Sequence, residues 1–85
     1  MITKEQASVE WAMLMYELDD AREHLERLMD EMNTDPEYDE GNFRVDLGHI
    51  FSHLNRAWHR RNLIGELKGD EWHEASKFPT DLDPT

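Results

Sequence analysis

Apolar residues recur through the first third of the chain with the spacing of an α-helix. Their steps alternate between four and three residues without a break, which places them along one side of a helix. The residues of this stripe are Ala7, Trp11, Leu14, Leu18, Ala21, Leu25, Leu28 and Met32. Because Thr3 and Gln6 have the spacing of a capping box, the pattern predicts a helix over about residues 4–33.

A second stripe with the same spacing follows a turn that contains Pro36. Its residues are Phe43, Leu47, Ile50, Leu54 and Ala57. Asp35 before Pro36 is typical of an N-cap followed by a proline in the first turn, which allows a helix start at residue 36. Gly41 weakens those first turns, so the alternative start is about residue 43. Asn62 and Gly65 are stop signals that place the helix end at about residue 64.

The last part of the chain, residues 69–85, has a weaker pattern. The stretch 70–77 predicts a short helix capped by Asp70, and later prolines impose an extended end. Trp72 and Phe78 are large apolar residues of this tail. They either hold the tail against the helices or form a docking peptide for a partner.

The short connection between two long helices favours an antiparallel pair. The sequence therefore predicts an all-α fold, with residues 1–68 as a two-helix hairpin and residues 69–85 as a short C-terminal extension.

The first predicted helix has more apolar surface than one neighbouring helix covers. Val9, Met13 and Tyr16 lie at i, i+4 and i+7, away from the stripe, and with Trp11 they form an exposed patch. We therefore expect a homodimer that forms a four-helix bundle and associates through these four residues. In the alternative interpretation, the C-terminal tail folds back over the patch.

The chain has 85 residues and no cysteine, which predicts one small domain without disulfides. Very regular helix packing, oligomerisation or a metal held by His and carboxylate groups would supply the stability that so small a core lacks. The N-terminal residues have no secretory pattern, and no apolar run approaches the ~20 residues that span a bilayer. A cytoplasmic location is therefore expected.

The net charge of −11 argues against direct binding to nucleic acid or to an anionic membrane, because both require clustered Lys and Arg. It suits a basic protein partner. Residues 1–42 have a net charge of −10, whereas residues 43–68 have +3 and residues 69–85 have −4. We therefore expect the second helix to lie against the first with opposite charges facing.

Asp46, His49 and His53 lie on one side of the second predicted helix, because residues three, four and seven apart line up. The first helix carries a similar set, which is Glu17, Asp20 and His24. Imidazole and carboxylate groups are ligands of zinc and iron. Asp46-x-x-His49 resembles the Glu-x-x-His element of ferritin-like bundles, which implies a metal held across a dimer. We favour the competing interpretation, in which these polar residues pair between helices.

Two other charged segments suggest chemistry. One is the basic group Arg56, Trp58, His59, Arg60 and Arg61, which suits phosphate or RNA binding but equally suits pairing with the acidic first helix. The other is a carboxylate series in which Glu23-x-x-Glu26 resembles half of the magnesium motif of all-helical nucleotide pyrophosphatases of the MazG type. The second helix lacks the matching E-x-x-D half, so we favour a solvated face.

These patterns together favour a non-catalytic protein–protein interaction module, such as an acidic adaptor, accessory subunit or inhibitor. The acidic residues available to a partner are Asp19, Asp20, Glu23, Glu26 and Asp30, and the tail offers Trp72 and Phe78. A variant of this hypothesis is a nucleic-acid mimic that fills a groove on a basic partner. The alternative is a metal-binding four-helix bundle that holds zinc or iron through Asp46, His49 and His53.

Overall fold

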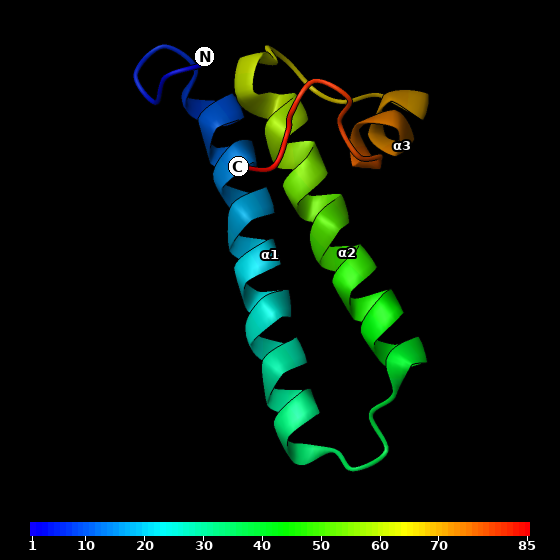
Figure 1. The fold of residues 1–85 in the computed structure, drawn as a ribbon. Coiled ribbons are helices and arrows are strands. Elements are labelled where there is room, and N and C mark those ends of the chain that lie inside the picture. Colours follow the sequence, from blue (N-terminus) through cyan, green and yellow to red (C-terminus); the bar gives the residue numbers. More distant parts are fainter.

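The protein is all-helical in a computed structural model that describes residues 1–85. Its elements are α1 (Ser8–Thr34), α2 (Glu40–His59), the 3-10 helix η1 (Arg60–Asn62) and α3 (Asp70–Ser76), and there is no strand (Figure 1). The predicted all-α class is therefore confirmed. None of these helices combines the length and the apolar character that a bilayer crossing requires.

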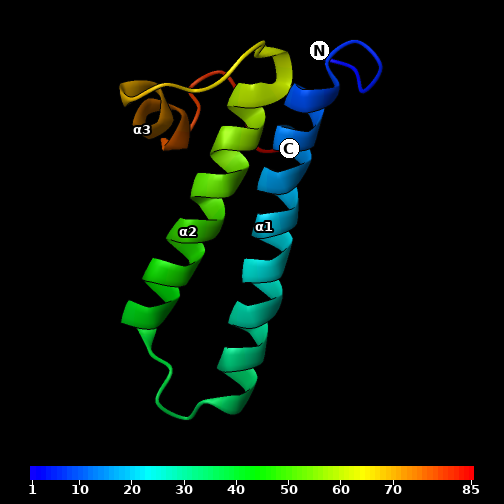
Figure 2. The same cartoon turned by 180° about the vertical axis from the view of Figure 1, so that it is seen from behind.

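The two long helices, α1 and α2, lie side by side and run in opposite directions (Figure 1). The short helix α3 packs against α2 and lies on the far side of α2 from α1, as the view from behind also shows (Figure 2). The C-terminal segment then crosses α2 and returns toward α1 (Figure 1). The molecule is thus one layer of two long helices with a small addition beside α2.

The start of α1 differs from the one that Thr3 predicts. The Thr3 hydroxyl does accept a hydrogen bond from the Gln6 amide at 3.2 Å, but this bond closes an isolated turn and α1 begins only at Ser8. Ala7 breaks the helical path with φ −142° and ψ 64°. The reason is tertiary: Ile2 is buried, and its amide donates to the Arg61 carbonyl at 2.8 Å, which turns the first residues back over the end of α2.

The start of α2 also lies at a residue that sequence reasoning did not select. Asp35 accepts a hydrogen bond from the Glu37 amide at 2.9 Å and so shapes the turn after α1, rather than capping α2. The N-cap is Asp39, whose side chain accepts from the Asn42 amide at 3.0 Å while Asn42 accepts from the Asp39 amide at 3.1 Å. The Asp39-x-x-Asn42 spacing was the sequence signal for this reciprocal cap.

Only one edge of the α1 stripe is buried. Every second stripe position, which means Ala7, Leu14, Ala21 and Leu28, is buried between α1 and α2. Leu18, Leu25 and Met32 stand beside them with about half of their surface exposed. The buried apolar residues form two small clusters, and no large side chain is completely buried. The chain by itself therefore has a thin core.

Candidate functional site

One side of the α1–α2 pair is an exposed apolar surface, which we call the apolar face. Helical periodicity lines up its members on each helix, and their exposed fractions lie between 36% and 56%. They are Met15, Leu18, Leu25, Met29 and Met32 of α1 and Phe43, Phe51 and Leu54 of α2. Single exposed apolar residues are ordinary on a protein surface, whereas eight of them along one side of a helix pair are not.

The C-terminal tail borders the apolar face and is fastened to α2. Phe78 meets Phe51 edge to face with ring centroids 5.1 Å apart, and the Trp58 indole donates to Asp81 at 2.9 Å. The latter bond is the main cause that lowers the pKa of Asp81. Trp72 lies under the Arg56 guanidinium at 4.1 Å. Trp72 and Phe78, which were candidates for partner binding, thus both contact α2 of their own chain.

The four residues predicted to mediate dimerisation do not form one patch. Val9 and Tyr16 are 65% and 67% exposed, on the side of α1 away from α2. Trp11 packs against the first core cluster, and the Met13 sulfur accepts from Arg60 at 3.9 Å. Their role in self-association stays a prediction, and most of the exposed large apolar residues of the two long helices lie on the apolar face instead.

Between the two core clusters, the helices are joined by buried charged groups. Glu17 of α1 accepts from the Arg56 Nε of α2 at 2.5 Å, and Arg56 also donates to the Ser76 hydroxyl at 2.8 Å. The second Glu17 oxygen lies 3.3 Å from His53 Nδ1. All three of Glu17, His53 and Arg56 are buried. Arg56 therefore serves the interior of the chain rather than an RNA-binding surface.

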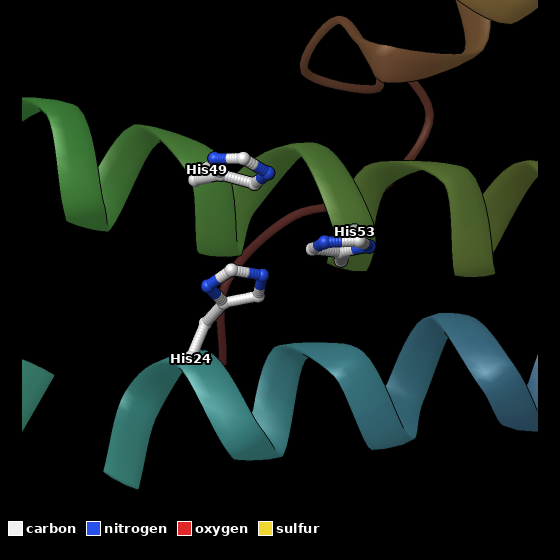
Figure 3. A group of neighbouring side chains, drawn as sticks. All are labelled: His24, His49 and His53. Atoms are coloured by element: carbon white, nitrogen blue, oxygen red, sulfur yellow. The ribbon is translucent and has the colours of Figure 1, made fainter. Parts of the chain in front are cut away.

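Three histidines meet beside these charged groups, and we call them the histidine cluster. His24 projects from α1 toward His49 and His53 on α2 (Figure 3). The ring centroids are 4.6, 5.2 and 5.4 Å apart, and the rings are nearly parallel. One nitrogen from each ring lies within 4.8 Å of the others. Burial lowers the pKa of His24, and neighbouring His49 and His53 lower it further.

The histidine cluster differs from the predicted metal set in one member. Asp46 accepts a hydrogen bond from the Tyr38 hydroxyl at 2.8 Å and takes no part in the cluster. Burial and this bond raise the pKa of Tyr38 to about 12. His24 stands where Asp46 was expected, and the cluster is complete within one chain instead of across a dimer. The sequence showed that His24 lies seven residues after Glu17, on the same side of the first helix. It did not show which residues of α2 lie opposite His24.

The remaining charged candidates lie at the surface or bond within the chain. Glu23, Glu26 and Asp30 are exposed on the outer side of α1, which agrees with a solvated face. Asp19 forms an ion pair with Arg22 on the same helix. Another group brings the ligand oxygens of Glu17 and Asp20 within 4.8 Å of each other and of a His53 nitrogen. Arg60 and Arg61 also bond within the chain: Arg60 donates to the Met13 sulfur, and Arg61 contacts Asp81 at 3.2 Å and covers the Trp58 ring at 3.8 Å.

Comparison of the chain with protein-family models, with curated proteins and with solved structures finds no match.

Proposed function

We propose that this protein is a non-catalytic interaction module whose antiparallel helical hairpin pairs with a second copy through the apolar face, giving a four-helix bundle. The observation that supports this proposal is the continuous row of half-exposed leucine, methionine and phenylalanine side chains along both long helices. In a chain with no completely buried large side chain, this row contains half of the large apolar residues that stay exposed to water.

The dimensions of the apolar face suit a dimer. From Met15 to Met32, a helix rises roughly 25 Å at 1.5 Å per residue, and two adjacent helices are roughly 20 Å wide. The flat outline of such a face is roughly 500 Å², which is the scale of the small interfaces below the standard ~800 Å² per partner, and the side chains that project from it add accessible area. A second copy offers a face of the same length and composition, so a two-fold axis brings the two layers together as a bundle.

The proposed dimer leaves other surfaces accessible. The histidine cluster lies on the opposite side of the helix pair from the C-terminal segment that borders the apolar face (Figures 1 and 3). The exposed acidic residues of α1, including Glu23 and Asp30, also face away from α2. An adaptor or accessory subunit of this design would use them for a second, basic partner.

The test is the mass of the full chain in solution, measured by sedimentation equilibrium. We expect the wild type to have twice the 10.1 kDa mass of one chain. The variant Leu18→Glu/Leu25→Glu should be monomeric, with at least about 100-fold weaker association, because a dimer would bury two unpaired carboxylates per copy. Circular dichroism checks that the helices persist.

The matched control is Val9→Glu/Tyr16→Glu, which adds the same charge to the same helix outside the apolar face. We expect this control to remain dimeric. A monomeric wild type would overturn the proposal. A control that dissociates while Leu18→Glu/Leu25→Glu stays dimeric would move the interface to the patch around Val9 and Tyr16.

A further inference from the structure

His53 has one ring nitrogen with polar neighbours and one without. Only 8% of the residue is exposed. Its Nδ1 lies 3.3 Å from a Glu17 oxygen and 3.0 Å from Arg56 Nη2, whereas its Nε2 is buried and makes no hydrogen bond. A buried nitrogen without a partner is destabilising unless a water or an ion occupies the space beside it.

Two more imidazole rings reach that side of α2. His24 comes from the facing helix α1, and His49 lies one helical turn before His53. One nitrogen of each ring lies within 4.8 Å of the others, so a single ion between them would be within reach of all three (Figure 3). Neutral imidazole is the preferred ligand of zinc and of its late first-row neighbours.

We propose that His24, His49 and His53 are the ligands of a divalent late transition-metal ion, of which Zn²⁺ is the reference case, bound within a single chain. The ion accepts the lone pair of His53 Nε2 and so gives that buried nitrogen the partner it lacks.

Glu17 holds His53 in the orientation that the site requires. Metal-binding histidines commonly donate their other ring N–H to a carboxylate, which fixes the tautomer and the ring. Here His53 Nδ1 lies 3.3 Å from one Glu17 oxygen and can donate to it when it carries the hydrogen, and Arg56 holds the other Glu17 oxygen at 2.5 Å. In the other tautomer, Nδ1 accepts from Arg56 Nη2 and Nε2 carries the hydrogen. Metal binding selects the first tautomer, because only that one leaves a lone pair on Nε2.

Asp20 is the carboxylate best placed as the fourth ligand. It lies on α1 three residues after Glu17 and four before His24, and these spacings share one side of a helix. The ligand oxygens of Asp20 and Glu17 lie within 4.8 Å of a His53 nitrogen. Because Arg56 engages Glu17, the Asp20 carboxylate is the freer of the two. Three imidazoles and one carboxylate would complete a tetrahedral shell.

Binding requires a local rearrangement of the rings. Ligand nitrogens of one tetrahedral zinc ion are roughly 3.3 Å apart, for Zn–N bonds of about 2.0–2.1 Å. The stacked rings must therefore turn so that their nitrogens converge. His49 is exposed and His24 is partly exposed, so both have room to rotate.

The test is isothermal titration of the full chain, purified without a histidine tag, with Zn²⁺ alone. We expect one ion per chain, and at least about tenfold weaker binding for His24→Gln and for His49→Gln. The bound Co²⁺ form should show the visible absorption bands of tetrahedral coordination. Neither variant removes a buried side chain, so loss of folding does not confuse the result.

The matched control is His59→Gln/His73→Gln, which removes the two histidines outside the cluster and should leave the affinity unchanged. Failure of the wild type to bind stoichiometric Zn²⁺ would overturn the proposal. So would a control that loses as much affinity as the cluster variants, because binding would then be spread over the surface. The dimer-breaking Leu18→Glu/Leu25→Glu chain should bind Zn²⁺ as the wild type does, so failure of the dimer proposal and of the metal site are distinguishable.

Discussion

The two sides of the α1–α2 pair reverse the usual relation between polarity and burial. On one side, Glu17, His53 and Arg56 are buried and bonded to one another. On the other side, Leu18 and Leu25 keep about half of their surface in water. Charged residues are among the least often buried, and leucine is among the most often buried. The difference teaches that an apolar stripe identifies residues suited to burial without identifying which chain covers them.

Residue size at the contact between the helices explains this difference. The buried stripe positions include three alanines, Ala7, Ala21 and Ala57, whose small side chains let α1 and α2 approach closely. Leu14 and Leu28 alternate with these alanines in the contact, whereas Leu18, Leu25 and Met32 lie on the edge that points away from it. The Glu17–Arg56 pair also favours this rotation of the helices, since another rotation would leave each buried charge without its partner.

The largest expected effect on stability comes from removing one member of the buried Glu17–Arg56 ion pair. Arg56→Met leaves the Glu17 carboxylate buried without its partner and should lower the free energy of unfolding by about 3–5 kcal/mol. Glu17→Leu/Arg56→Met removes both charges and should recover most of that loss. Urea unfolding at one fixed protein concentration measures both values. Equal losses for the single and the double variant would contradict a buried, mutually dependent pair.

A pair of leucine truncations sharpens the comparison between the two edges of the stripe. Leu28 is 3% exposed and Leu25 is 44% exposed, on the same helix. Leu28→Ala should lower the free energy of unfolding by about 2–5 kcal/mol at any protein concentration, because it opens a cavity in the second core cluster. Leu25→Ala should lower the free energy of unfolding of the dilute monomer by about 1 kcal/mol.

The concentration dependence of Leu25→Ala then reports on assembly. The loss in free energy of unfolding that Leu25→Ala causes should be larger at protein concentrations where the wild type is dimeric, because Leu25 is then buried against the second copy. Urea unfolding over a range of protein concentrations checks this result. Identical costs for Leu25→Ala at low and high concentration would mean that Leu25 stays open to water in solution.

The smallest expected effect concerns the tail beside the apolar face. The Trp58 indole bond, with help from Arg61, lowers the pKa of Asp81, so the charged Asp81 holds the tail to α2. This contribution is present above the ordinary pKa of 3.8 and is lost as the pH falls through the lower folded-state value. The Trp58 indole N–H resonance should therefore shift only in strong acid.

NMR spectra recorded from neutral to acid pH measure that shift. Asp81→Asn should move the Trp58 indole resonance already at neutral pH, whereas Asp83→Asn, two residues further along the tail, should leave it in place. A Trp58 resonance that responds equally to both variants would show that Asp81 does not hold the tail.

Much of the secondary structure was readable from the sequence. The unbroken steps of three and four predicted two long helices, and they are present as α1 and α2. Local signals competed at the helix starts, however. Thr3 offered a cap that closes only a turn, because burial of Ile2 redirects the chain, and Asp39 displaced Asp35 as the cap of α2. Such outcomes depend on contacts between residues far apart in the chain.

The sequence by itself determined which residues share one side of each helix, because the period of an α-helix is nearly constant. It therefore placed Glu17, Asp20 and His24 together on the first helix, and His49 and His53 together on the second. Only the tertiary structure decided how the two helices are rotated against each other. That rotation depends on the summed packing of side chains from both helices, and it brought His24 to the other histidines and left the leucine edge open.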